Sequence, residues 1–597
     1  MRADHHMWES NVEQFLKIGN YQCLVYDHRG TGHSDERGGI LSITSSTLAS
    51  DLKKLLTVLE WDNVNIIGVS LGGMIALEFA CKYTNMADPV SWEWAFRGTT
   101  YGVNGKSPIP PVYIDKGDTL ALHVHNSLDE PTAIHFHGMF LKGTPYYDGT
   151  GMVTECGIPP GKNFTYYVTP EQEGTYWIHS HYNHQDADGL RTPFIIRDST
   201  PIAEYEDDLL FSLEDWYPVP FQERVHSILK AGVPFPPAPE YAYGLINGYN
   251  GNDTKPINFK PGKKYRIRVL NMGITEQFKF SLPGHKMQII EVEGERTVPY
   301  DVDGVDVGPG QRYSVLVEAK DTDKFNYIYN VTIYAGFITL APGRNPHSYF
   351  GLVEYKPGAP INAPASIDDS NIHATNDIYL NSYDEEPLLE PVTKDLVFKF
   401  TTKIMADNIT HSILGNYPYN TALVPTIYTA LTMGDLATNP NVYGNQTQAQ
   451  VLDYGDIVEI EMHATSILDH TFHLHGHKFQ IVEYGPAFNA PDEYIAKNPV
   501  RRFKGAPLKR DTLKVNGFQY IKIRFKADNP GVWLFHCHMD VHFYMGLAVM
   551  FIEAPLVLQK SITMPEEMNQ LCHDLNVKTS GNGAGNAGFN MTGLPVL

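Results

Sequence analysis

The residues best suited to chemistry are histidines gathered in four short clusters. Each cluster holds a His-X-His pair, and side chains two residues apart in a β-strand point to the same face. Each pair can therefore direct two imidazoles at one metal ion, and imidazole suits copper, zinc, iron and nickel. The clusters are His135-Phe136-His137, His179-Ser180-His181, His470-Thr471-Phe472-His473-Leu474-His475, and His536-Cys537-His538 followed by His542.

One cysteine lies inside the fourth cluster. Cys537 stands between His536 and His538, so in a strand its side chain points away from both imidazoles. One thiolate with two imidazoles is the ligand set of an electron-transfer copper centre. A metal on Cys537 and a cluster on its neighbours would be joined by a short covalent path for electrons. The isolated pair His123 and His125 is predicted to be a polar strand face instead.

The composition restricts the partners. The 597 residues carry a formal net charge of −22, which argues against a nucleic-acid or anionic-membrane surface. Only 19 % of residues are charged and 12 % are aromatic, which is not the composition of a disordered chain. No apolar run reaches the roughly 18–20 residues of a membrane helix. We expect a monomer, and five cysteines are too few for a disulfide framework.

The elements that must position the histidines are predicted to be strands. Apolar and polar residues alternate over 120–125, 458–462 and 521–525, as in sandwiches of antiparallel strands. We place the sandwiches at 89–203, 204–355 and 386–556, with a linker at 356–385 and a C-terminal tail at 557–597. Residues 1–88 differ, because they follow a β-turn-α order. There Leu48, Leu52, Leu55 and Leu59 share one helical face.

Residues 89–575 resemble the three-domain multicopper oxidases of the fungal laccase and ferroxidase group. The resemblance rests on the four histidine clusters and on two segments, Asn-Pro-Gly-Val-Trp at 529–533 and Phe-Ile-Glu-Ala-Pro at 551–555. It implies a mainly β fold of three cupredoxin-like Greek-key sandwiches. It also implies four copper ions: one type 1, one type 2 and two type 3.

The resemblance further implies a copper assignment. The type 1 ion would be held by His470, Cys537 and His542. Leu547 occupies the axial position and cannot coordinate, which is expected to raise the type 1 potential. The type 2 ion would be held by His135 and His473, and the type 3 pair by His137, His179, His181, His475, His536 and His538.

Two further features follow from the resemblance, a pair of acids and a disulfide. Asp148 and Asp540 match acidic positions that would deliver protons while dioxygen is reduced to water. Cys156 and Cys572 match a disulfide that ties the first sandwich to the end of the chain.

The sequence leaves two classes of electron donor open, a phenolic compound and Fe(II). The iron oxidases of the family carry acids six residues after the second histidine of His-Ser-His and four residues before the first type 1 histidine. Here those positions are Ala187, flanked by Asp186 and Asp188, and Ser466. We therefore expect a laccase-like enzyme that oxidises a small phenol or naphthol, for example in pigment or secondary-metabolite formation. The alternative is a ferroxidase that converts Fe(II) to Fe(III).

Residues 21–84 resemble part of an α/β-hydrolase. The sequence Gly-Val-Ser-Leu-Gly at 68–72 fits the nucleophile elbow around Ser70, but the acid and histidine that should follow are missing because the pattern stops near Asn85. We expect a truncated segment from a fused or mispredicted gene model. Two other classes stay open. A serine hydrolase with a β-rich accessory module predicts labelling of Ser70, and a copper-storage protein predicts no oxygen consumption.

The destination is expected to be secreted, cell-wall or vacuolar. The first residues lack the apolar segment of a signal peptide, so we expect the native one to be missing from this sequence. Glycosylation acceptors occur after residue 89 alone, in keeping with a glycoprotein of the secretory route. They are Asn163, Asn252, Asn330, Asn408, Asn445 and Asn590.

Overall fold

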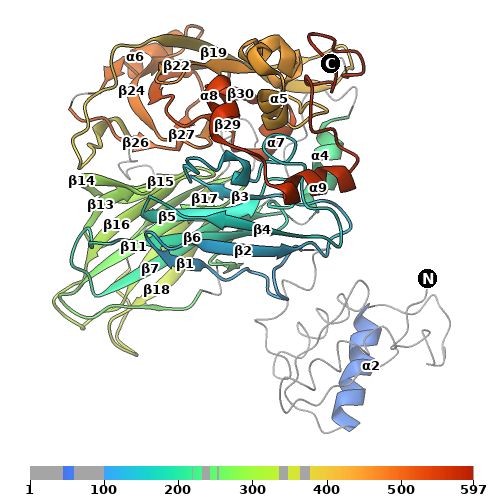
Figure 1. Ribbon diagram of the computed structural model, residues 1–597. Helices are drawn as coiled ribbons and strands as arrows, with labels where there is room; N and C mark the ends of the chain where they lie inside the picture. Colours follow the sequence, from blue (N-terminus) through green and yellow to red (C-terminus); the bar gives the residue numbers. More distant parts are fainter. Residues whose placement is uncertain are drawn as a thin grey trace. The chain divides into compact units, whose positions relative to one another are not determined.

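The computed structural model (Figure 1) describes residues 45–58, 100–217, 219–230, 242–251, 254–334, 347–363, 377–503 and 505–595. The chain divides into one unit before Thr100 and a second from Thr100 onward. In the first unit the described element is helix α2 (Ser45–Val58). Its buried face is formed by Leu48, Leu52 and Leu56, which follow the i, i+4, i+8 spacing. The predicted helix is therefore present, whereas the elbow at Ser70 lies outside the described residues.

The first sandwich of the second unit carries two of the histidine clusters. Its four-stranded sheet has the order β1-β6-β5-β3, and β2 pairs with β4. In β2 the apolar residues are half-buried and alternate with exposed ones, as predicted. The strands are β1 (Val112–Asp115), β2 (Leu120–His125), β3 (Ile134–His137), β4 (Asn163–Val168), β5 (Gly174–Ser180) and β6 (Arg191–Arg197).

The second sandwich lies between the clusters in sequence. Its sheets have the orders β14-β13-β16-β11-β7-β8-β9 and β10-β18-β17-β12-β15. Its elements are β7 (Asp207–Trp216), α4 (Phe221–Ile228), β8 (Tyr243–Ile246), β9 (Tyr249–Asn250), β10 (Ile257–Asn258), β11 (Lys264–Asn271), β12 (Gln277–Ser281), β13 (Met287–Val292), β14 (Glu295–Val302), β15 (Gly304–Val307), β16 (Arg312–Glu318), β17 (Tyr327–Tyr334) and β18 (His347–Glu354).

The third sandwich carries the other two clusters. Its sheets have the orders β20-β19-β22-β28-β24-β25, with β26 also on β24, and β21-β30-β29-β23-β27. Its strands are β19 (Lys394–Ile404), β20 (Thr410–Leu414), β21 (Gln450–Leu452), β22 (Ile457–Ala464), β23 (His470–Leu474), β24 (Phe479–Pro486), β25 (Arg501–Arg502), β26 (Lys509–Arg510), β27 (Thr512–Val515), β28 (Gln519–Lys526), β29 (Gly531–Cys537) and β30 (Ala548–Glu553).

Short helices connect and cover these strands. The α-helices of this part are α5 (Thr426–Thr432), α6 (Asp492–Lys497), α7 (Asp540–Tyr544), α8 (Pro555–Ser561) and α9 (Glu566–Asp574). Single 3₁₀ turns are η5 (Pro145–Tyr147), η7 (Asp377–Tyr379), η8 (Gly434–Thr438), η9 (Pro440–Tyr443) and η10 (Asn445–Thr447). Among the described residues, no helix combines the length and the apolar character needed to cross a bilayer.

The sheets are mixed rather than purely antiparallel, which corrects the expectation. In the three sandwiches β1 runs parallel to β6, β7 to β11 and β19 to β22. Alternation with a period of two specifies which face of a strand is buried, but it does not specify the direction of the neighbouring strand. The sequence pattern therefore predicted the strands correctly and their pairing only in part.

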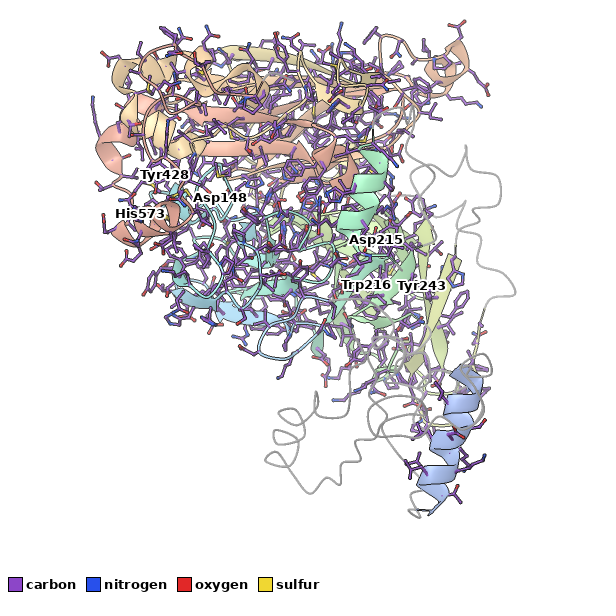
Figure 2. The ribbon with its side chains drawn as sticks, turned by 90° about the vertical axis from the view of Figure 1, so that its right-hand side faces the viewer. Asp148, Asp215, Trp216, Tyr243, Tyr428 and His573 are labelled. Atoms are coloured by element: carbon purple, nitrogen blue, oxygen red, sulfur yellow. A yellow bond between two sulfur atoms is a disulfide. The ribbon has the colours of Figure 1, made fainter. Side chains whose placement is uncertain are left out.

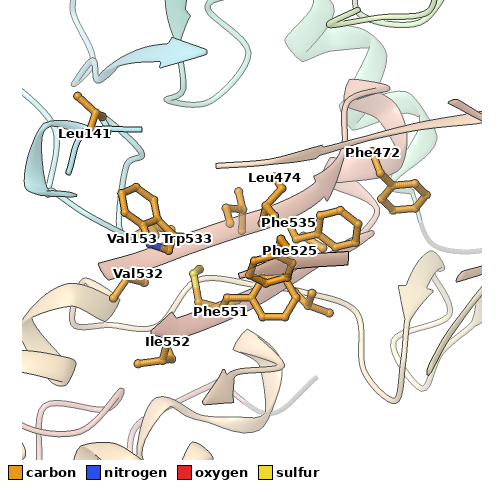
Figure 3. Packing of buried hydrophobic residues seen from close by; sticks show 14 of the residues in the cluster. Leu141, Val153, Phe472, Leu474, Phe525, Val532, Trp533, Phe535, Phe551 and Ile552 are labelled. Atoms are coloured by element: carbon orange, nitrogen blue, oxygen red, sulfur yellow. The ribbon is translucent and has the colours of Figure 1, made fainter. Parts of the chain in front are cut away.

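The first and third sandwiches share one apolar core. A single buried cluster runs from Phe136 through Trp533 to Cys572, while the second sandwich has a separate core. Figure 3 shows Leu141 and Val153 of the first sandwich with the aromatic side chains of the third. The predicted disulfide between Cys156 and Cys572 is present and ties the first sandwich to α9.

The C-terminal segment is more ordered than a tail. It contains α8 and α9, and the turn beyond them is hydrogen-bonded to the third sandwich. Gly583 donates its N–H to the carbonyl of Val442 and accepts from the N–H of Leu423. Asn582 is fully buried and its side chain accepts from the backbone N–H groups of Ala584 and Asn586. Local side-chain hydrogen bonds thus order a segment whose composition suggested an extended chain.

Candidate metal centre

Strand register brings the first two clusters together. Strands β3 and β5 are antiparallel, and His135 lies directly opposite His179. Residues opposite each other in a sheet have neighbouring side chains on the same face. The rings of His135 and His179 are accordingly 5.3 Å apart, and His181 lies 5.5 Å from His135.

Strand register also brings the two clusters of the third sandwich together. Strands β23 and β29 are antiparallel and pair His473 with His536. The two sandwiches then meet ring to ring, because His135 stacks on His475 at 4.0 Å and His137 stacks on His473 at 3.6 Å. The remaining rings are His181, 5.3 Å from His536, and His538, 5.0 Å from His137. All eight histidines predicted for the type 2 and type 3 ions therefore form one cluster, and the space between their rings is called the cavity below.

A second group lies beside this cavity. The Sγ atom of Cys537 is 3.6 Å from Nδ1 of His470 and 3.7 Å from Nδ1 of His542. All three residues are buried. Leu547 is buried as well, and its carbonyl accepts the N–H of Cys537. The sulfur of Met545 accepts a hydrogen bond from the hydroxyl of Ser412, at 3.9 Å.

The nitrogens that face the cavity fit a metal. Nε2 of His135, His179 and His473, Nδ1 of His137 and both ring nitrogens of His538 are buried without a hydrogen-bond partner. Nε2 of His475 and Nε2 of His536 approach to 3.2 Å. Buried polar atoms are normally satisfied, so this concentration of lone pairs indicates ions that the residues would coordinate.

The protonation states fit as well. Burial lowers the pKa of His470 well below its usual range, and it lowers those of His542 and His181 to about 4 and about 3. These imidazoles are neutral at neutral pH, as metal ligands must be. Burial raises the pKa of the Cys537 thiol to about 12. A metal bound there would therefore displace the thiol proton.

Asp148 contacts two of the cavity histidines. Its Oδ2 accepts a hydrogen bond from Nδ1 of His475 at 2.9 Å, and its Oδ1 is 3.3 Å from Nδ1 of His135. Burial raises the pKa of Asp148, but the two imidazoles outweigh burial and hold it well below its usual range. Figure 2 shows Asp148 where the first and third sandwiches meet.

Asp540 belongs to a different group of acids. It is buried in α7, between His538 and His542 in sequence. Burial raises its pKa well above the usual range, and the nearby Asp186 and Asp215 raise it further. The surroundings therefore favour the neutral form of Asp540, whereas they favour the ionised form of Asp148.

The acids expected of an iron oxidase are engaged elsewhere. Ala187 is buried. Oδ2 of Asp186 lies 3.6 Å from Nδ1 of His179, and the Asp188 carboxylate accepts the N–H of Phe221. Ser466 accepts the N–H of Leu468 through its hydroxyl. Reading the expected acidic position one residue earlier or later, at Asp186 or Asp188, therefore still gives a carboxylate that is already engaged.

The sequence did not predict the residues that hydrogen-bond to the outer ring nitrogens of the histidines. Asp511 and Thr512, at the start of β27, contact His137 and His473, and Asp511 is in turn bound by Arg312. An acidic residue beside a buried strand was the signal available, but the contact with His137 spans 374 residues of sequence.

Family models described as multicopper oxidase match residues 90–201, 207–356 and 419–557, and a model described as alpha/beta hydrolase fold matches residues 3–91. An iron transport multicopper oxidase of Epichloe festucae, fetC, is 35 % identical over 82 % of this chain and 79 % of its own length. The iron transport multicopper oxidase fio1 of Schizosaccharomyces pombe is 37 % identical over 81 % of this chain and 77 % of its own.

Solved structures agree. The crystal structure of Fet3p, a multicopper oxidase that functions in iron import, matches with a TM-score of 0.75 and 29 % identity over 82 % of this chain and 94 % of that one. A laccase from Botrytis aclada matches with a TM-score of 0.65 and 28 % identity over 80 % and 88 %. The chain belongs to the multicopper oxidase family. It is an oxidoreductase with the cupredoxin-like fold and the type 1, type 2 and type 3 copper of that family.

Proposed function

We propose that the two groups of side chains hold the four copper ions as the sequence assigned them. His470, Cys537 and His542 would hold type 1 copper, and His135 and His473 would hold type 2 copper. The unpartnered nitrogens facing the cavity support this assignment. The type 3 pair would be held by His137, His179, His181, His475, His536 and His538.

Bound copper would supply one-electron oxidation of the donor and four-electron reduction of dioxygen to water. The chain supplies the route between the two groups. Cys537 faces His470 and His542, while its neighbours His536 and His538 face the cavity. The backbone of these three residues therefore joins both groups through a few covalent bonds.

Asp148 and Asp540 are proposed to serve proton delivery. Their pKa values are shifted in opposite directions, because imidazoles stabilise the anion of Asp148, whereas burial and neighbouring acids favour the neutral form of Asp540. A pair of acids with separated pKa values can divide the tasks of donating and accepting protons.

We propose Fe(II) as the electron donor, which reverses our expectation of a phenol or naphthol. The observation that carries this is the set of relatives at 32–37 % identity that are named for iron transport. Asp469 directly precedes the type 1 residue His470 in sequence, and its side chain is 22 % exposed. Carboxylate oxygen suits a hard cation.

A small phenol or naphthol is the second candidate donor. The structure favours it in one respect, because Asp186 and Asp188 are engaged and Ser466 replaces an acid. Asp469 is also shared, since it accepts the N–H of Gly517 and lies 3.6 Å from the ammonium of Lys514. An organic donor would need no carboxylate.

The two donors are separated by one comparison on the copper-loaded protein. We expect kcat/KM for Fe(II) to exceed that for a panel of diphenols, and Asp469→Asn to lower kcat/KM for Fe(II) alone. The diphenol reaction of the same variant is the control for damage to the type 1 site. Better oxidation of diphenols than of Fe(II) by the native protein would reject iron as the donor.

An oxidising compartment is proposed for the protein. The Cys156–Cys572 disulfide supports this, because such bonds persist in secreted proteins and are rare in reducing compartments.

A further inference from the structure

The second sandwich reaches the copper cavity although it contributes no side chain to the described groups of candidate ligands. Gly310, in the loop before β16, has φ +81°, and a Cβ there would lie 3.0 Å from the ring of His538 and 3.2 Å from that of His137. Arg312 is fully buried and donates two hydrogen bonds of 2.6 Å to the carboxylate of Asp511. The sandwich therefore packs directly against the residues that line the cavity.

Glu293 makes the most unusual of these contacts. It forms, with Gly294, the two-residue turn between β13 and β14, and both residues have positive φ, +52° and +75°. Such a turn favours Asn or Asp before Gly, because a longer side chain is disfavoured in the left-handed region. Glu293 is nevertheless fully buried. A disfavoured conformation at a buried acid indicates that its contacts hold it there.

Those contacts fix three consecutive residues of the third sandwich. Oε2 of Glu293 accepts the backbone N–H of Asp511 at 2.8 Å and of Thr512 at 2.9 Å. Oε1 accepts from Nη2 of Arg510 at 2.5 Å. Without the carboxylate, two buried N–H groups at the start of β27 would lose their acceptor.

The fixed residues select the nitrogen that each of two histidines turns to the cavity. Nε2 of His137 lies 3.0 Å from the Thr512 hydroxyl and 3.3 Å from the Asp511 carboxylate, which leaves Nδ1 facing the cavity. Nδ1 of His473 lies 3.0 Å from the Asp511 carbonyl, which leaves Nε2 facing the cavity. Second-layer hydrogen bonds of this kind set ring orientation and tautomer.

We propose that Glu293 is a positioning residue for the type 2 and type 3 copper: by holding residues 510–512 it fixes the orientation of His137 and His473. The second sandwich thereby controls a copper site for which none of its described residues is a candidate ligand. The inference rests on the copper assignment proposed above.

The test compares Glu293→Asp with Asp377→Asn in the copper-loaded full chain. Aspartate tolerates the left-handed turn, but it is one methylene shorter and cannot reach the amides of 511 and 512. Asp377 pairs with the same Arg510 and touches neither amide, so its variant is the control for a weakened contact to Arg510 with both amide acceptors kept. Type 2 electron paramagnetic resonance, blue type 1 absorption, the melting temperature and copper loss to a chelator are measured.

We expect Glu293→Asp to release type 2 copper roughly 10–100-fold faster and to alter its resonance, with the blue absorption and melting temperature of the control. Equal copper retention in both variants, or equal loss of both copper types with a lowered melting temperature, would overturn the proposal. If Glu293→Asp does not fold, Thr512→Val carries the test, and unchanged copper retention there overturns it. A native chain without type 2 copper would instead show that the copper assignment is wrong.

Discussion

Replacing Glu155 by Gln should make the protein more stable at alkaline pH and not at acidic pH. Glu155 is buried, and both its oxygens lie near one donor, the hydroxyl of Tyr166, at 2.9 and 3.0 Å. Burial raises its pKa from 4.5 to about 8; the Tyr166 hydrogen bond opposes this, and the charge of Asp148 adds to it. No ion pair among the described residues includes Glu155.

The sign and size follow from proton linkage. Below pH 4.5 the carboxyl is protonated in the folded and unfolded states, so it contributes no pH dependence. Between pH 4.5 and about 8 the folded state holds a proton that the unfolded state has released, so the free energy of unfolding falls as pH rises. A difference of about 3.5 pH units at 1.36 kcal/mol each corresponds to a loss of about 5 kcal/mol, complete above pH 8.

The assay is the thermal unfolding midpoint of native protein and Glu155→Gln at pH 4 and pH 9. The neutral amide does not titrate, so the variant avoids this loss of stability. Its unfolding midpoint relative to that of the native protein should therefore be several degrees higher at pH 9 than at pH 4. Glu171→Gln, at an exposed position of the same sandwich, is the matched control and should follow the native protein. An equal offset between Glu155→Gln and the native protein at both pH values would refute the reasoning.

Three further predictions follow from the structure. Asp148→Asn should slow dioxygen consumption and leave the blue absorption intact, because Asp148 contacts His475 rather than Cys537; unchanged turnover would reject its proton role. Cys156→Ser should lower the free energy of unfolding by roughly 2–5 kcal/mol, measured by denaturant titration; Cys572→Ser should match it, since both break one bond. Mass spectrometry of glycopeptides should find Asn408, which is exposed, modified and Asn330, which is fully buried, unmodified; a glycan on Asn330 would contradict the packing of β17.

Much of the fold could be predicted from local sequence patterns. The alternation over 458–462 and 521–525 placed two buried strands correctly, because the side-chain period of a strand is a property of the backbone itself. The leucine spacing after residue 48 placed α2 for the same reason. The relative direction of paired strands could not be predicted. For example, β19 and β22 pair in parallel although more than fifty residues separate them in sequence, and the residues of one strand carry no information about the strand with which it pairs.

The sequence by itself determined the chemistry of this protein: histidines at a period of two, with one cysteine among them, must present several imidazoles and a thiolate from strand faces. The tertiary structure decided everything that depends on residues far apart in the chain. It set His135 opposite His179, chose which nitrogen of His137 and His473 faces the cavity, and brought Glu293 behind them. The physical reason is that ligand type is a property of a residue, whereas ligand orientation is a property of the hydrogen bonds that surround it.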